Sequence, residues 1–141
     1  MKNGYGAYTS TPVETADQGK LILIAYDVAI KHCKLSLECF NDREFIKERT
    51  QHICKAQDAV TELMSALRMD VGEIARNLYR LYDYILRRMV EANIKNDKAR
   101  IQEVLVYLVD LRDAWDQAIA NLKREAAKAS EPVLQNFAIT G

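Results

Sequence analysis

Proline and glycine are scarce in this 141-residue chain, which contains two prolines and five glycines. The prolines, Pro12 and Pro132, stand near the two ends, and residues 13–131 contain none. Because proline disrupts helix interiors and this stretch is rich in Leu, Ala, Glu, Lys and Arg, the sequence predicts an all-α fold. The glycines are scattered, so none of them belongs to a glycine-rich loop of the kind that binds phosphate.

Net charge and long apolar runs are also missing. The 20 basic residues balance 20 acidic ones, so the chain has no electrostatic signature of nucleic-acid binding. The longest apolar runs, 21–26 and 104–109, are far shorter than the roughly 20 residues of a membrane span. We therefore expect no nucleic-acid partner and no membrane insertion. The three cysteines form no Cys-x-x-Cys pair, and we interpret them as reduced thiols of a cytoplasmic protein.

The histidines and cysteines of this sequence do not form any of the metal-binding motifs typical of helical proteins. A di-iron helical bundle needs Glu-x-x-His on two helices, but Ala29 and Arg49 stand three residues before His32 and His52. No two pairs of Cys or His residues have the spacing of a zinc site. The sequence therefore predicts no metal, no cofactor and no catalytic residue, and we expect a protein that is not an enzyme.

One motif leaves an alternative open. His52-Ile53-Cys54-Lys55 resembles the His-x-x-Lys of histidine phosphotransfer domains, which are helical bundles with a phosphorylated imidazole. Those domains have glycine at the next position, where this chain has Ala56. The alternative function is therefore a phosphotransfer bundle that uses His52. Phosphorylation by acetyl phosphate or a histidine kinase would distinguish it from a binding protein.

The periodicity of apolar residues predicts four helices. The first begins at Thr15, which has capping-box spacing to Gln18, and the second follows Asn41 and Asp42. The inward stripe expected for the first helix is Leu21, Ile24, Ala25, Val28, Ala29, His32, Leu35 and Cys39. The stripe expected for the second is Phe45, Ile46, Ile53, Ala56, Val60, Leu63, Met64 and Leu67.

Gly72 marks the boundary before the third helix, which is expected to end between Asn93 and Asn96. The fourth helix then begins at Asp97. The inward stripe expected for the third helix is Ile74, Leu78, Leu81, Tyr82, Ile85, Met89 and Ala92. The stripe expected for the fourth is Ile101, Val104, Leu105, Leu108, Leu111, Trp115, Ala118, Ile119 and Leu122.

The connections between these helices are short, which places sequence neighbours antiparallel. The sequence therefore predicts an up-down-up-down four-helix bundle over residues 15–128. We expect a flexible N-terminal segment, 1–14, and a separate C-terminal tail, 129–141. The first and fourth helices are apolar over more than one stripe, which a four-helix bundle does not need. This surplus indicates a covered surface or a partner-binding groove.

Several segments resemble the FliS family, the flagellin-specific export chaperones of bacterial flagella. The strongest are residues 82–97, from Tyr-Asp-Tyr-Ile-Leu to Asn-Asp, and residues 110–115, Asp-Leu-Arg-Asp-Ala-Trp. Residues 7–27, with Ala-Tyr, Val-Glu-Thr-Ala and a Tyr-Asp pair, also follow the family pattern, as do residues 55–63. The chain departs from it at Gln18, where the family has proline, and at Ala25, where it has leucine.

The resemblance implies a cytoplasmic chaperone that binds the C-terminal segment of flagellin, blocks premature polymerisation and delivers flagellin to the flagellar type III export gate. It leaves open whether the chain is a monomer or a homodimer. The flagellin-binding candidates that it implies are Tyr8, Leu21, Ile24, Tyr82, Tyr84, Leu86, Asn93 and Trp115. Asn93 and Trp115 also suit purely structural roles, in a turn and in the core. Tyr8 precedes the first helix, so the N-terminal segment is a candidate lid over the groove.

Overall fold

The computed structural model describes residues 16–140, and the side chains of residues 18–70 and 72–129. Its long helices are α2 (Ala16–Leu37), α3 (Ile46–Ser65), α4 (Glu73–Lys95) and α5 (Lys98–Thr140). Two short 3₁₀ helices, η1 (Arg43–Phe45) and η2 (Met69–Val71), precede α3 and α4. The described residues contain no strand, so the predicted all-α four-helix bundle is confirmed. The expected cap at Thr15 and segment 1–14 lie outside the described residues.

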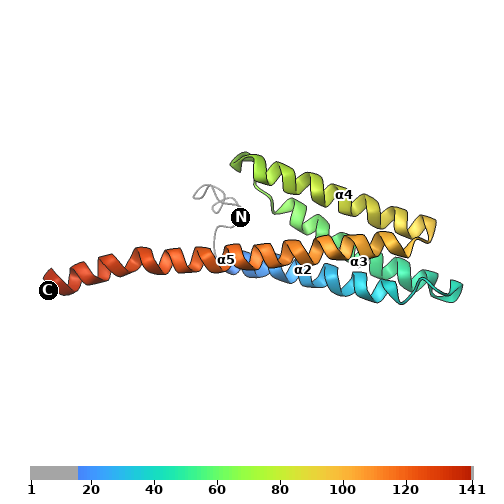
Figure 1. The fold of residues 1–141 in the computed structure, drawn as a ribbon, viewed down its shortest axis with the longest axis horizontal. Coiled ribbons are helices and arrows are strands. Elements are labelled where there is room, and N and C mark those ends of the chain that lie inside the picture. Colours follow the sequence, from blue (N-terminus) through green and yellow to red (C-terminus); the bar gives the residue numbers. More distant parts are fainter. Residues whose placement is uncertain (1–15, 141) are drawn as a thin grey trace.

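The four helices pack in a closed cycle. α2 contacts α3 and α5, and α4 contacts the same two helices from the opposite side. In Figure 1 the chain turns back at the end of each helix, so each of them runs beside the one before it. Diagonal partners, such as α2 and α4, therefore meet only through side chains that reach the centre.

The helix boundaries follow from local capping residues, as the sequence predicts. The carboxylates of Asp42 and Asp97 each accept a hydrogen bond from the backbone N–H two residues further on, at 3.0 and 3.1 Å. Asn96 ends α4 in the left-handed conformation, with φ 54°. Gly72 precedes α4 with φ 112°, a value that side-chain-bearing residues rarely adopt. These residues fix where η1, α4 and α5 begin or end.

A buried arginine ties α3 to the end of α4. Arg49 is 4% exposed, and its Nε and Nη1 donate to the side-chain oxygens of Asn93 and Asn96 at 2.9 and 2.6 Å. Its Nη2 donates to the Asn93 carbonyl at 3.1 Å, and its guanidinium lies 4.6 Å from the centre of the Phe40 ring. The side-chain amide of Asn93 also donates to Thr50 at 3.1 Å. Asn93 thus has the structural role that its residue type suggests.

The core is centred on two tyrosines that cross the bundle. Tyr26 of α2 and Tyr82 of α4 are almost completely buried, and their hydroxyl groups hydrogen-bond to each other. Burial is the main reason that the pKa of each phenol is raised above its usual value. The same core cluster contains fully buried aliphatic side chains, among them Val60, Ile85 and Leu108. Two diagonal helices are therefore linked by one polar contact inside an apolar core.

The predicted inward face of the first helix is wrong at three of its eight positions, whereas Ala29 and Cys39 of that stripe are buried as expected. Leu21, Ile24 and Val28 are 65%, 48% and 38% exposed. The residues of α2 that are buried are Gly19, Tyr26, Ala29, Cys33 and Ser36. Their spacing of three, four or seven residues forms a stripe that shares Ala29 with the predicted one and is centred about one residue further round the helix. Phe45, Ile46 and Ile74 were also expected in the core, and all three are exposed.

Close packing of α2 against α5 explains this choice of face. A Cβ atom at Gly19 would lie 2.9 Å from side-chain carbons of Ile119, so a larger residue there would require the Ile119 side chain to shift. Burial also raises the pKa of the Cys33 thiol to about 12, as expected for a small core-filling residue. The lack of a side chain at Gly19 lets Ile119 of α5 approach α2, and Leu21, Ile24 and Val28 of α2 remain exposed on the neighbouring face.

The last helix is much longer than the others. α5 has 43 residues and continues to Thr140, whereas the sequence predicts a boundary after residue 128. Figure 1 shows the C-terminal half of α5 projecting beyond the rest of the bundle. Across the described residues, none of the helices has both the length and the apolar character of a membrane span.

Candidate functional site

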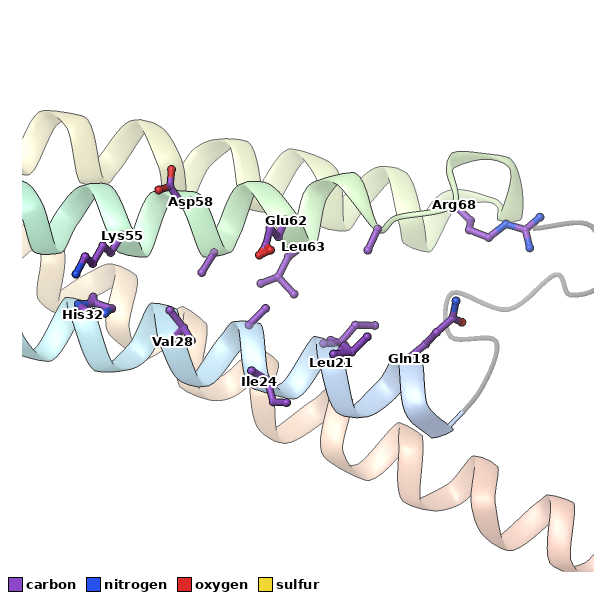
Figure 2. A pocket seen from close by; sticks show the side chains of 14 residues that line it. Gln18, Leu21, Ile24, Val28, His32, Lys55, Asp58, Glu62, Leu63 and Arg68 are labelled. Carbon is purple, nitrogen blue, oxygen red and sulfur yellow. The ribbon is translucent and has the colours of Figure 1, made fainter. Parts of the chain in front are cut away.

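A groove runs between α2 and α3 along one side of the bundle (Figure 2), and its volume is about 640 Å³. We call it the α2/α3 groove. The residues that line it are Gln18, Leu21, Ile22, Ile24, Ala25, Val28, His32, Lys55, Asp58, Ala59, Glu62, Leu63, Ala66 and Arg68. The exposed apolar residues of α2 thus border a surface depression, and they are not scattered over the bundle.

The floor and one rim of the groove are apolar. Ala59 and Leu63 of α3 belong to the core and are 4% and 3% exposed. Leu21, Ile24 and Val28 form the rim on the α2 side, where each is at least a third exposed. A continuous apolar surface of this kind favours binding of another apolar surface, because association removes both from water.

The opposite rim, on α3, is charged. Lys55, Asp58 and Glu62 line the groove there and are exposed. In the described part of the chain, none of the three forms an ion pair. In Figure 2 the side chains of Lys55 and Glu62 lie on the side of α3 that is turned towards α2, whereas the Asp58 carboxylate lies on the opposite side of α3. The groove is therefore asymmetric, with one apolar rim and one charged rim.

Two histidines meet at one end of the groove. The Nδ1 atoms of His32 and His52 are 3.0 Å apart, and the rings stack with their centres 5.2 Å apart. Burial, followed by the charges of His52 and Lys55, lowers the pKa of His32 below its usual value. His52 is only partly exposed, and its imidazole is engaged with a second histidine. A phosphotransfer domain needs a freely accessible imidazole, so this geometry does not favour the alternative function.

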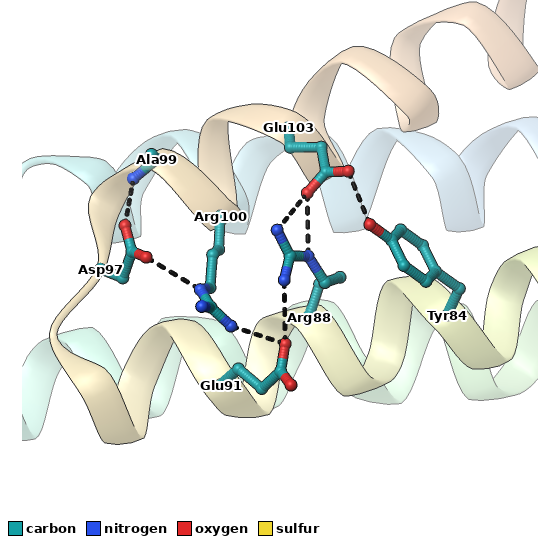
Figure 3. A network of polar contacts seen from close by, with 7 residues as sticks. All are labelled: Tyr84, Arg88, Glu91, Asp97, Ala99, Arg100 and Glu103. Carbon is teal, nitrogen blue, oxygen red and sulfur yellow. Dashed lines mark hydrogen bonds and ion pairs between the residues drawn. The ribbon is translucent and has the colours of Figure 1, made fainter.

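A polar network joins α4 to the start of α5 (Figure 3). The Tyr84 hydroxyl donates to Glu103 Oε2 at 2.7 Å, and Arg88 Nε donates to Glu103 Oε1 at 2.9 Å. Arg88 also donates to Glu91 at 3.1 Å, and Arg100 donates to the same carboxylate at 2.8 Å. The hydrogen bond from Tyr84, and then that from Arg88, lowers the pKa of Glu103. The network links α4 to the start of α5 and engages the hydroxyl of Tyr84.

The residues expected to bind flagellin lie in different places. Leu21 and Ile24 lie on the α2 rim of the groove. Tyr82 and Trp115 line a smaller pocket of about 10 Å³, whose lining shares Ile22, Leu63 and Ala66 with the groove. The other candidates lie elsewhere or outside the described residues: Tyr84 in the α4/α5 network, Leu86 packed against the core, Asn93 in the α4 turn, and Tyr8 in the segment before residue 16.

Of the 14 residues that line the groove, only Leu21 and Ile24 are among the flagellin-binding candidates from the sequence. The missed residues include Val28, which the sequence analysis places in the core, and the two acidic residues Asp58 and Glu62. The four-residue spacing of the two acidic residues was a signal that they share one face of their helix. Nothing in the sequence pattern alone showed that this face meets α2. Among the described side chains, no group of three or more His, Cys, Asp and Glu residues is arranged to hold a metal ion.

Comparison with known proteins gives a consistent family. A family model described as flagellar protein FliS matches residues 1–122. A relative named flagellar secretion chaperone FliS, from Bacillus subtilis (strain 168), is 34% identical over 125 residues, which are 89% of this chain and 92% of the relative. Its namesake from Salmonella typhimurium (strain LT2) is 31% identical over 121 residues, 82% of this chain and 89% of the relative. A protein named FliSB from Pseudomonas aeruginosa is 41% identical over 76 residues, 53% of this chain and 60% of the relative.

Proposed function

Because the chain belongs to the FliS family of flagellar secretion chaperones, we propose that it binds the C-terminal segment of flagellin in the α2/α3 groove. In this proposal the bound chaperone prevents flagellin from polymerising in the cytoplasm and delivers it to the flagellar type III export gate. The observation that supports the α2/α3 groove as the binding site is its exposed apolar rim, which is formed by Leu21, Ile24 and Val28.

The shape and chemistry of the groove support an amphipathic helix as the bound form. An amphipathic helix places its apolar face into a hydrophobic groove and leaves its polar face in water. The two walls of the groove are themselves helices, and its apolar floor is formed by buried residues such as Ala59 and Leu63. A segment that is disordered before binding would become ordered there.

The proposed activity is binding and release, without catalysis. Folding a disordered segment on binding typically costs about 2–5 kcal/mol of the gross interaction energy. This cost keeps the complex reversible, so that flagellin can be released at the export gate without ATP hydrolysis by the chaperone. Burial of the segment's apolar face is also what prevents its association with other flagellin molecules.

Titration calorimetry with the C-terminal segment of flagellin from the same organism tests the proposal. We expect saturable one-to-one binding with a negative heat-capacity change, since apolar surface is buried. In the variant Leu21→Gln/Ile24→Gln we expect binding to weaken by about tenfold to a hundredfold, which is the loss of roughly 1.4–2.8 kcal/mol of apolar contact. Because both residues are exposed, the variant should melt at nearly the wild-type temperature.

The matched control is Val106→Gln/Val109→Gln. These two valines are 60% and 36% exposed and are also three residues apart, but they lie on α5, which is not part of the groove. The control should bind the flagellin segment with nearly wild-type affinity. Equal losses in the two variants would contradict the assignment to the α2/α3 groove, and no binding by the wild type would contradict the function itself.

A second expected result concerns residues 1–14, which we propose act as a lid over the apolar groove when flagellin is absent. Deleting them should leave the helical circular dichroism signal nearly unchanged, because the four helices lie beyond this segment. The affinity for the flagellin segment should rise, since a bound lid competes with flagellin for the same apolar surface. Unchanged affinity within error would contradict the lid, without affecting the proposed groove.

A further inference from the structure

The two helices that form the walls of the α2/α3 groove are joined at one end by the two histidines of the chain. His32 and Lys55 line that end of the groove, and Gln18 and Arg68 line the other. In Figure 2 the ribbons of α2 and α3 lie closer together at His32 and Lys55 than at Gln18 and Arg68. The two helices therefore diverge from the histidine end, where the contact with His52 ties them together.

The two imidazole rings meet through their Nδ1 atoms. These atoms are 3.0 Å apart, and the ring planes are inclined by 26°. The ring centres are 5.2 Å apart, close to the sum of the Nδ1–Nδ1 distance and the two ring radii, so each Nδ1 points towards the other. A hydrogen bond in this geometry needs one Nδ1 that carries a proton and one that does not. The pair can hold one positive charge, on the Nε2 of the donor ring, but a proton on the second Nδ1 breaks the bond.

The charges around the pair disfavour a second proton. Burial is the first cause that lowers the pKa of His32, followed by the charges of His52 and Lys55 on α3 and of Lys31 on its own helix. Each of these groups is a cation or becomes one in acid. Glu48, one turn before His52 on α3, is exposed to solvent. Among the described residues, no carboxylate and no group on α4 or α5 shifts the pKa of His32.

We propose that the hydrogen bond between His32 and His52 holds the two walls of the α2/α3 groove together at the histidine end, and that a second proton on the pair releases them. The pair thereby positions the apolar rim of α2 relative to α3. This inference rests on the proposed function and deepens it by making flagellin binding depend on pH. Because the complex needs the closed pair, it binds fewer protons than the free protein, and the affinity falls as the pH falls through the titration range of histidine.

Proton NMR of the two imidazoles tests the pair without any ligand. The chain contains only two histidines, so both signals can be followed from about pH 8 to about pH 5 without overlap from others. We expect two separate titration steps, the second of them below the range of an isolated histidine, because the two sites are coupled. A single step in which both imidazoles titrate with an ordinary pKa would overturn the proposal.

Thermal melts give a second measurement on the free protein. In the unfolded chain both histidines have an ordinary pKa of about 6.5, so the unfolded state binds more protons than the folded state in this range. The melting temperature of the wild type should therefore fall between about pH 7.5 and about pH 5.5. A melting temperature that stays constant over this range would contradict the release of the pair by acid.

The affinity for the flagellin segment is then compared at the same two pH values. We expect the wild type to bind about threefold to tenfold more weakly at the lower pH. The matched control is His32→Asn/His52→Asn, whose two amides can hydrogen-bond to each other but do not titrate in this range. The control should bind with nearly equal affinity at both pH values. A loss as large as that of the wild type would show that acid acts on the flagellin segment, and would overturn the proposal.

The failures of the two proposals can be told apart. If flagellin binds with an affinity that does not change with pH, the role of the pair is wrong and the chaperone function stands. If flagellin does not bind at either pH, the proposed function is wrong, and the NMR titration and the melts decide on the pair. If the double variant loses its helical circular dichroism signal, His52→Asn replaces it. A protonated His32 can still donate to the Asn oxygen, so this variant should lose less affinity in acid than the wild type, and an equal loss would overturn the proposal.

Discussion

Replacing Arg49 with methionine is expected to lower the free energy of unfolding by about 2–4 kcal/mol. Methionine retains much of the apolar volume but donates no hydrogen bond. The side-chain oxygens of Asn93 and Asn96 and the Asn93 carbonyl would then lose a charged donor at the end of α4. The contact of the guanidinium with the Phe40 ring would be lost as well. Chemical denaturation monitored by circular dichroism measures the change.

The control for this prediction is Arg87→Met on α4. The Arg87 side chain is 70% exposed and pairs only with Asp83 at 3.0 Å, which is an exposed i,i+4 contact of small value. Its replacement should change stability by less than about 0.5 kcal/mol. Equal effects of the two substitutions would show that the buried hydrogen bonds of Arg49 contribute nothing measurable. Arg49→Lys should be intermediate, since an ammonium group cannot reproduce the planar fork of donors.

The largest expected effect is that of Ile85→Ala, which should cost roughly 3–5 kcal/mol of folding stability. Ile85 is fully buried in the core at the middle of α4. Truncation removes its apolar contacts and leaves a cavity that neighbours such as Val60 and Leu108 can fill only in part. Thermal and denaturant melts of the full chain measure the loss.

Ile94→Ala is the control on the same helix. Ile94 is 76% exposed, so the same atoms are removed without creating a cavity, and the expected change is below about 0.5 kcal/mol. A loss at position 94 as large as that at position 85 would contradict the packing described here. Tyr84→Ala should fall between the two, because it removes the hydrogen bond to Glu103 and the edge-to-face contact with Tyr107.

Helix boundaries were predictable because their causes are local. Asp42, Asn96 and Asp97 act through hydrogen bonds or backbone conformations within a few residues of themselves. Gly72 does so through its own φ angle. A pattern of a few residues therefore contains the information that fixes these positions. The sequence prediction is confirmed at Gly72, Asn96 and Asp97, whereas Asp42 caps η1 and α3 itself begins at Ile46.

The orientation of α2 was not predictable in the same way. Two adjacent faces of this helix are apolar, and the face with Leu21 and Ile24 is the more hydrophobic of the two. The buried face includes Gly19 and Ser36, which carry no hydrophobic signal. The burial of this face depends on Ile119, which is one hundred positions further along the chain and whose side chain packs directly against Gly19. The pattern of apolar residues in a single helix does not predict contacts of this kind with a distant helix.

The candidate site was predictable in part for a related reason. Family resemblance pointed to Leu21 and Ile24, which do lie on a groove, and also to Tyr82, which lies in the core. Resemblance marks positions that a family shares, whether they maintain the fold or contact a ligand. The acidic residues Asp58 and Glu62 became candidates only when the pairing of α2 with α3 placed them on the groove.

The length of α5 has a consequence for measuring the size of the molecule. At about 1.5 Å per residue, its 43 residues extend roughly 65 Å, against roughly 35 Å for the 23 residues of α4. A body with such a projection diffuses more slowly than a sphere of 16.1 kDa. Gel filtration calibrated with globular standards therefore overstates its mass and can make a monomer resemble a dimer. Light scattering, which does not depend on shape in this way, is the appropriate measurement of the oligomeric state.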